Sequence, residues 1–263
     1  SLSALADMTG WKKSELTPCL KSMVKKGLIN LVQKDGEAQV LLLPFIVGFY
    51  ENQRETLDRE LAQLVDDYFT ETGFRLLEVQ PAFHRVIPVR EAVDTKIEIL
   101  PESDIAAILS HKQAWAVTDC ICRKQQALLD QACEHPLRTC LIMSDIPQAF
   151  DSRQDMDALT YDQALRVLEQ AADAGLVHTV ANHRDGLSYI CNCCTCSCGI
   201  LRGIAEARLA NVVARSAYQA VVAEEDCVGC GVCEAACQFG AIQVFETAEI
   251  NQNTCVGCGV CVR

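Results

Sequence analysis

Two runs of cysteine near the C-terminal end have the spacing of a loop that holds an iron–sulfur cube. Both repeat C-x2-C-x2-C, and one more cysteine follows the first run: Cys227, Cys230, Cys233, Cys237, Cys255, Cys258 and Cys261. Three thiolates at this spacing, on a short loop that contains glycine, can bind three irons of one [4Fe–4S] cluster. Because the pattern occurs twice, a disulfide framework or a zinc ribbon is the weaker alternative.

On these runs, residues 220–263 resemble the bacterial-type two-cluster [4Fe–4S] ferredoxins. In that family the fourth cysteine of each run binds the neighbouring cluster, so the resemblance implies that Cys237 shares one cluster with the second run. It also implies that the first run takes its fourth ligand from beyond Arg263, so that this C-terminal ferredoxin-like unit is truncated here. Gln238 stands where the family usually has proline.

Nine further cysteines lie in residues 111–199. Four are spread out and five are crowded: Cys120, Cys122, Cys133 and Cys140, then Cys191, Cys193, Cys194, Cys196 and Cys198. Four thiols suffice for one cluster or one tetrahedral zinc, and the neighbouring ferredoxin-like runs favour iron. Adjacent thiolates repel each other, so the crowded group also favours a metal. We expect two more [4Fe–4S] clusters, either one per group or with ligands shared between the groups.

One thiol of the nine would then be left over. If the crowded segment is helical, Cys194 lies on the same face as Cys191 and Cys198, which makes Cys193 or Cys196 the expected spare thiol. Arg123 could donate a hydrogen bond to cluster sulfur and raise its reduction potential. His135 could act as a metal ligand, as a hydrogen-bond donor to a ligand or as a cap, and the ligand role ranks last of the three. The Cys-x-Cys-Arg loop and the crowded group together resemble an uncharacterised group of anaerobe ferredoxin-type proteins, which has no assigned activity.

Residues 1–50 resemble a winged-helix domain. The pattern predicts helices at Leu2–Met8 and Ser14–Lys26, the second capped by Ser14 and ended by Gly27. Strands Leu28–Val32 and Gln39–Leu43 would follow, joined by a turn at Asp35-Gly36. Lysines outnumber acids here and could contact phosphates, but the segment has no arginine to read bases, so protein docking is favoured over DNA binding.

A similar pattern of helix, glycine and hairpin recurs around Gly175 and Asp185-Gly186, which indicates a structural repeat or a chance recurrence. Among the remaining elements, we expect an amphipathic helix Glu51–Thr72, whose apolar face would carry Leu57, Leu61, Leu64, Val65 and Tyr68. The others expected are an extended segment Phe74–Glu98, a helix Pro101–Leu109, a strand Trp115–Val117, a helix Lys124–Ala132, a linker helix Ile200–Tyr218 and a strand Ala220–Ala223.

The composition indicates the cellular compartment of the protein and the kinds of partner that it can bind. Seventeen cysteines gathered in clusters, in a chain of 263 residues, are typical of metal ligands in a reducing compartment. The net charge of −12 repels nucleic acid from the chain as a whole. The longest apolar stretch, Val40–Tyr50, is too short to span a bilayer. We therefore expect a cytoplasmic protein of an anaerobe.

The predicted fold class is α+β, in five segments: a winged-helix-like domain 1–50, a connector 51–110, a cysteine-rich domain 111–199 with a possible second helix-hairpin unit, a linker helix 200–219 and the ferredoxin-like domain 220–263. No nucleotide-binding motif or catalytic triad order stands out. The sequence favours an electron-transfer subunit of an oxidoreductase, without a substrate site of its own. It would pass electrons between redox partners such as a flavoprotein, a ferredoxin or a larger complex, and an oligomer is conceivable.

Two other functions remain open on the same residues. One is an iron–sulfur redox sensor that binds DNA through the winged helix. The other is an enzyme whose cluster has one iron without a protein thiolate.

Overall fold

The computed structural model describes residues 1–34, 36–89, 104–183 and 186–262. The chain divides into two compact units, residues 1–58 and 59–263. Helices and strands are mixed in both units, which confirms the predicted α+β composition. Within the described ranges, we find no helix with the length and apolar character that crossing a membrane requires.

Unit 1 has the predicted order of two helices and a hairpin. Helices α1 (Leu2–Thr9) and α2 (Lys13–Lys25) pack on the antiparallel pair β1 (Ile29–Lys34) and β2 (Glu37–Leu42). Their shared core is built on Leu16, Leu20 and Ile29.

The cap of the second helix was predicted wrongly. Helix α2 begins one residue earlier than expected, because the Glu15 carboxylate accepts a hydrogen bond of 2.9 Å from the backbone N–H of Lys12, which becomes the N-cap in place of Ser14. Asp35 of the expected hairpin turn lies outside the described residues.

The helix predicted over Glu51–Thr72 is interrupted. A short 3-10 turn (Glu51–Gln53) comes first, and α3 (Arg59–Glu71) starts where unit 2 begins. Its buried face carries Phe69, whereas Leu64 and Tyr68, which we expected to face inward, are 60% and 49% exposed. The Phe69 ring packs against Phe74 inside the fold, with ring centroids 5.7 Å apart.

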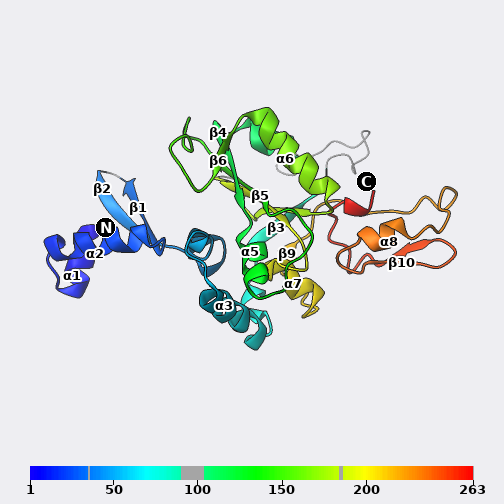
Figure 1. Ribbon diagram of the computed structural model, residues 1–263, viewed down its shortest axis with the longest axis horizontal. Helices are drawn as coiled ribbons and strands as arrows, with labels where there is room; N and C mark the ends of the chain where they lie inside the picture. Colours follow the sequence, from blue (N-terminus) through cyan, green and yellow to red (C-terminus); the bar gives the residue numbers. More distant parts are fainter. Residues whose placement is uncertain (35, 90–103, 184–185, 263) are drawn as a thin grey trace. The chain divides into compact units, whose positions relative to one another are not determined.

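Unit 2 is organised around a seven-stranded sheet, drawn from cyan to yellow in Figure 1. The strand order is β6-β4-β5-β8-β7-β3-β9, and every pair is antiparallel except β3 and β9. The strands are β3 (His84–Ile87), β4 (Ala114–Asp119), β5 (Arg138–Ser144), β6 (Asp157–Leu159), β7 (Val177–Ala181), β8 (Tyr189–Cys193) and β9 (Val213–Ala214). Strand β4 confirms the one expected at Trp115–Val117, and β3 lies within the segment Phe74–Glu98 that was expected to be extended.

Helix α6 (Tyr161–Asp173) lies along this sheet, beside β4 and β5 (Figure 1). With α4 (Ile105–Ser110) it covers a core that includes Leu141, Leu168 and Ile190. Asp104 caps α4, whereas Pro101, the expected start, lies outside the described residues, as does the 90–98 part of the segment predicted to be extended.

The predicted second helix-hairpin unit is present as a local pattern. Helix α6 ends before Gly175, whose φ of 73° only glycine adopts readily, and β7 and β8 form the hairpin. Both strands are interior strands of the large sheet, whereas β1 and β2 form a sheet of their own. Asp185 of the second turn lies outside the described residues.

Three other expectations fail around the cysteines. Helix α5 (Ile121–Leu128) begins directly after Cys120 instead of at Lys124. The linker helix is only α7 (Gly199–Ala205), because Arg208 and Asn211 take positive φ values of 54° and 64° and the chain then enters β9. Ala220–Ala223 forms no strand.

The C-terminal segment carries a short helix and a hairpin, α8 (Val232–Ala236), β10 (Ile242–Val244) and β11 (Ala248–Ile250). We call the part of unit 2 that contains the seven-stranded sheet the sheet domain. The C-terminal segment is attached to it by backbone and side-chain hydrogen bonds. The N–H of Val89, just beyond β3, donates to the carbonyl of Cys258 at 2.9 Å.

Candidate metal centres

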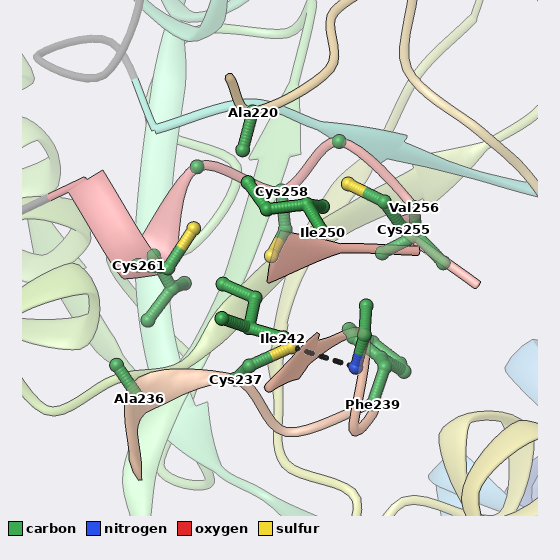
Figure 2. Close-up of a pocket in the computed structure, with 14 residues that line it drawn as sticks. Ala220, Ala236, Cys237, Phe239, Ile242, Ile250, Cys255, Val256, Cys258 and Cys261 are labelled. Atoms are coloured by element: carbon green, nitrogen blue, oxygen red, sulfur yellow. Dashed lines mark hydrogen bonds between the residues drawn. The ribbon is translucent and has the colours of Figure 1, made fainter. Parts of the chain in front are cut away.

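Four cysteines of the C-terminal segment line one cavity (Figure 2): Cys237, Cys255, Cys258 and Cys261. Cys237 follows α8, and the other three come from the last loop of the described chain. The remaining wall is mainly apolar, with Phe239, Ile242 and Val260 among its side chains. This is the set of four that the ferredoxin resemblance implies for one cluster. We call it the cavity centre.

The electrostatics of the cavity centre suit a cationic cluster core. Burial, and then the neighbouring thiols, raise the pKa of Cys258 to about 12 and that of Cys261 to about 11. Negative thiolates are therefore costly here unless iron offsets their charge. The N–H of Ala241 donates to Cys237 Sγ at 3.3 Å, the type of hydrogen bond that stabilises a thiolate ligand. The donor set fits a [4Fe–4S] cluster.

Glycines allow the ligand loops to lie against other backbone. A Cβ on Gly229 would come within 2.7 Å of the Glu246 carbonyl oxygen, and one on Gly257 would overlap the Tyr218 carbonyl oxygen. Both residues also have positive φ, 65° and 73°. The two C-x-x-C loops thus require glycine for conformation and for space.

The first cysteine run, Cys227, Cys230 and Cys233, is more exposed to solvent than the cavity centre. Cys230 is exposed, and Cys227 and Cys233 are partly buried. The Cys227 thiol accepts a hydrogen bond from the N–H of Ala248 at 3.3 Å, and this bond, with a second from Gly229, lowers its pKa. Cys233 is close enough to Cys261 for its charge to raise the Cys261 pKa. The two runs are therefore neighbours.

Six cysteines of the middle domain are linked by pairwise thiol interactions into a group that we call centre A. Three are buried and three are partly buried: Cys120, Cys193 and Cys198, then Cys122, Cys140 and Cys191. Hydrogen bonds with the Cys120 and Cys198 thiols, together with burial, raise the pKa of Cys122 well above its usual value. Cys193 interacts with both Cys191 and Cys198, while Cys140 lies against Cys120.

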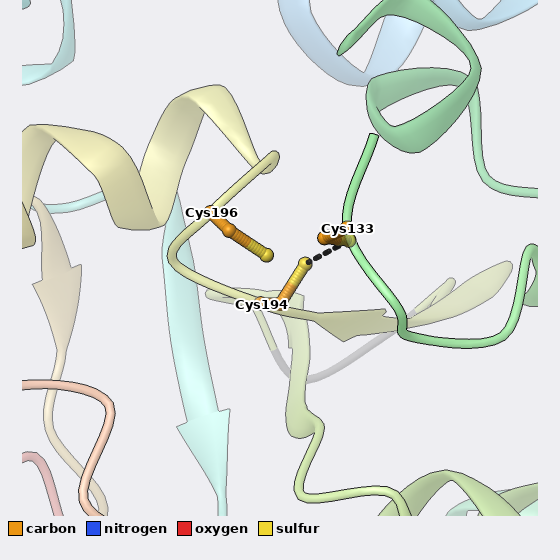
Figure 3. A group of neighbouring side chains, drawn as sticks. All are labelled: Cys133, Cys194 and Cys196. Carbon is orange, nitrogen blue, oxygen red and sulfur yellow. Dashed lines mark hydrogen bonds between the residues drawn. The ribbon is translucent and has the colours of Figure 1, made fainter. Parts of the chain in front are cut away.

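The other three middle cysteines form centre B (Figure 3). The Sγ atoms of Cys133, Cys194 and Cys196 all lie within 4.8 Å of one another, and those of Cys133 and Cys194 are 4.0 Å apart. Cys133 comes from the loop after α5, whereas Cys194 and Cys196 belong to the turn after β8. Ser197 Oγ lies 3.4 Å from Cys133 Sγ.

These groups differ from the simplest prediction, in which Cys133 joins Cys120, Cys122 and Cys140. Strand pairing places Cys140 opposite Thr118, close to Cys120, while α5 carries the chain onward before it reaches Cys133. The crowded cysteines are not helical throughout, because Cys191–Cys193 end strand β8. The geometry matches the alternative in which the two segments share their ligands. Cys193 and Cys196, one of which was expected to be the spare thiol, both lie inside a group.

Arg123 lies between centre A and centre B. It is buried, and its guanidinium donates to the Pro136 carbonyl at 2.9 Å, to Thr139 Oγ1 at 2.7 Å and to the Asn192 carbonyl at 2.7 Å. Although burial opposes its charge, the cysteines around it, Cys120 of centre A foremost and then Cys194 of centre B, raise its pKa. Its Nε is buried without a hydrogen-bond partner among the described residues, and such a donor suits an acceptor sulfur.

Two further residues, His135 and Gln238, lie near the thiol groups without belonging to them. His135, for which the ligand role ranks last, is not part of either thiol group, and burial lowers its pKa. In the sequence, Gln238 is distinctive only because it stands where the ferredoxins usually have proline. Its side chain connects the C-terminal segment to centre B, since Oε1 accepts from the N–H of Thr195 at 2.8 Å and Nε2 donates to the Gly175 carbonyl. Nothing in the sequence indicates these partners.

Comparison with known proteins bears on the C-terminal segment. Residues 220–243 match the family model described as a 4Fe-4S binding domain, and this stretch contains Cys227, Cys230, Cys233 and Cys237. No curated protein and no solved structure matches the chain. The matched domain and the gathered cysteines together indicate an iron–sulfur protein that binds [4Fe–4S] clusters.

Proposed function

We propose that this protein is an electron-transfer subunit of an oxidoreductase, which passes single electrons through several [4Fe–4S] clusters. The observation that carries the proposal is the hydrogen bond between Gln238 and Thr195. Gln238 directly follows Cys237 of the cavity centre, and Thr195 lies between Cys194 and Cys196 of centre B. One side chain therefore connects the loops of two centres.

Centre B and centre A are connected along the backbone itself. Cys193 belongs to centre A and Cys194 to centre B, so a single peptide bond joins a ligand of one centre to a ligand of the other. Because electron tunnelling weakens steeply with distance, this arrangement favours rapid transfer between them. The proposed order is the cavity centre, then centre B, then centre A, with Cys227, Cys230 and Cys233 holding the cluster next to the cavity centre.

The surface around the first cysteine run supports docking of a redox protein. Val228, Val232 and Phe245 are 84%, 64% and 68% exposed, close to the exposed Cys230. Acidic residues accompany them, namely Glu224, Glu225, Asp226, Glu234 and Glu246. An acidic rim around an apolar patch attracts a partner with a basic face, such as a flavoprotein, a ferredoxin or a larger complex. A reducing cytoplasm, as in an anaerobe, suits so many thiolates.

The test combines a redox titration with a docking assay. Anaerobic protein reduced by dithionite should take up electrons in several one-electron steps, followed by paramagnetic resonance. The reduced protein should then reduce a basic c-type cytochrome at a rate that falls as salt rises. Clusters that dithionite cannot reduce, or a rate independent of salt, would contradict the proposal.

A second candidate function is a redox-sensing regulator that binds DNA. It is favoured by unit 1, a separate compact unit with the helix-helix-hairpin order of a winged helix and exposed lysines on α2. We rank it lower, because the segment lacks arginine and the chain is strongly acidic.

A further inference from the structure

A second cavity lies next to the cavity centre, within unit 2. It has a volume of about 210 Å³, and it is lined by the end of α7, the loop that leads to β9 and the turn after β11. Phe239 and Val256 line both cavities, so these two residues lie between them. We call the second cavity the arginine cavity.

The polar lining of the arginine cavity is positively charged. Arg208 and Arg215 belong to it, and none of its lining residues is acidic, although the chain as a whole carries a net charge of −12. Asn211, Asn253 and Thr254 add neutral hydrogen-bond donors. Cationic and neutral donors without a carboxylate favour an anionic ligand.

The two arginines differ in what they contact. The Arg215 guanidinium donates to the Gln252 carbonyl at 3.0 Å and to the Asn253 carbonyl, so it holds the turn that forms one wall of the cavity. The Arg208 side chain has no ion pair or hydrogen bond with the residues that the structure describes. Its guanidinium is therefore available to a ligand, and its planar fork suits a phosphate or a carboxylate.

The backbone of this loop is also unusual. Arg208 and Asn211 have positive φ values of 54° and 64°, which residues other than glycine adopt at a cost. The N–H of Leu209 donates to the Gly203 carbonyl at 3.1 Å, which ties the loop back to α7. Strained backbone of this kind is common at ligand sites.

We propose that the arginine cavity binds a small dianion of the phosphate or dicarboxylate class through the Arg208 guanidinium. Sites for drug-sized ligands usually measure about 300–1,000 Å³, so the ligand is smaller than a nucleotide. Its negative charge would lie beside the cavity centre, across Phe239 and Val256, and would oppose the addition of an electron to the cluster there. By linkage, reduction of that cluster weakens anion binding. This linkage rests on the proposed iron–sulfur function, whereas the anion site does not.

Isothermal titration calorimetry of the oxidised protein, with inorganic phosphate and separately with malonate, tests the site. We expect saturable binding of at least one of the two anions, and an affinity lower by about tenfold or more in Arg208→Asn. Asparagine tolerates the positive φ, so this variant removes the guanidinium and keeps the loop. The control is Arg166→Gln, which removes an exposed charge on α6 and should bind as the wild type does. No saturable binding of either anion, or equal affinities in the two variants, would overturn the site.

The same titration on protein that has been reduced with dithionite and desalted under anaerobic conditions tests the linkage. The reduced wild type should bind the anion more weakly than the oxidised protein. In Cys258→Ala, which removes a ligand of the cavity centre, the affinity should no longer change on reduction. Equal affinities of the oxidised and reduced wild type, or a change that persists in Cys258→Ala, would overturn the linkage. Clusters that dithionite cannot reduce would contradict the proposed electron transfer instead, and the anion site would stand on the first titration.

Discussion

Gln238 fixes the position of Thr195. Its side-chain oxygen accepts a 2.8 Å hydrogen bond from the Thr195 N–H, and its amide nitrogen donates to Gly175, at the end of α6. A proline at this position, as in the ferredoxins that the segment resembles, could make neither bond. The residue that departs from the family pattern is thus one of those that join the C-terminal segment to the sheet domain.

Replacing Gln238 with leucine should weaken this connection without removing a ligand. Two partly buried hydrogen bonds are lost, so the free energy of unfolding should fall by about 1–3 kcal/mol. Electron transfer between the cavity centre and centre B should slow several-fold, as measured by rapid freezing and paramagnetic resonance. Gln243→Leu, an exposed glutamine on β10, is the matched control. Equal rates in the two variants would exclude Gln238 from the path.

Arg123 should raise the reduction potentials of centre A and centre B. Arg123→Met removes a positive charge between them, so both potentials should become more negative, and the lost hydrogen bonds should cost about 2–4 kcal/mol of stability. Arg123→Lys keeps the charge but not the planar fork, so it should restore most of the potential and little of the stability. A redox titration checks this. Unchanged potentials in Arg123→Met, with Arg166→Met on the exposed face of α6 as the control, would contradict it.

His84 should make stability depend on pH. Burial lowers its pKa from 6.5 to about 3, so the folded protein keeps the ring neutral, with Nε2 at 2.9 Å from the Tyr189 hydroxyl. Above the unfolded pKa neither state binds the proton. As pH falls from 6.5 towards 3 only the unfolded state binds it, so the folded state loses stability.

This loss should be about 1.4 kcal/mol between about pH 8 and about pH 5.5. Urea unfolding of the wild type and of His84→Phe measures it, because the variant should lack this part of the pH dependence. His111→Phe, which alters an exposed histidine, is the control. The same pH slope in wild type and His84→Phe would show that the ring is not held neutral.

Unit 1 should not retain duplex DNA at moderate salt. The exposed lysines of α2, including Lys21 and Lys25, can contact phosphates only weakly in so acidic a chain. A mobility-shift assay on oxidised and reduced protein tests this. Retention that changes with oxidation state, and that Lys21→Glu abolishes, would favour the regulator instead.

The sequence predicted the local elements of this protein better than it predicted the contacts between distant parts of the chain. The helices and hairpin of unit 1, the strand at Trp115 and the glycine end of α6 follow from spacing and turn residues. The inward face of α3 was missed because Phe69, which packs against Phe74, lies outside the apolar set that the periodicity picked out. The short α7 was missed because two residues with positive φ, Arg208 and Asn211, are neither glycine nor a recognised turn pair.

The same distinction applies to the metal centres. The cavity centre could be predicted because its four cysteines follow a known spacing. Centre A and centre B could not, because their grouping depends on the pairing of β4 with β5, which brings Cys120 to Cys140, and of β5 with β8, which places Cys194 on the side of the sheet where Cys133 lies. The order of residues alone left both groupings open.

The iron and acid-labile sulfide content of anaerobically purified protein tests the central claim most directly. Four clusters predict about sixteen irons and as many sulfides per chain, and Cys122→Ala with Cys194→Ala should reduce this towards about eight. A folded, colourless protein without iron would contradict the account. About eight irons in the wild type, with zinc bound in the middle domain, would limit the clusters to the C-terminal segment and remove the relay.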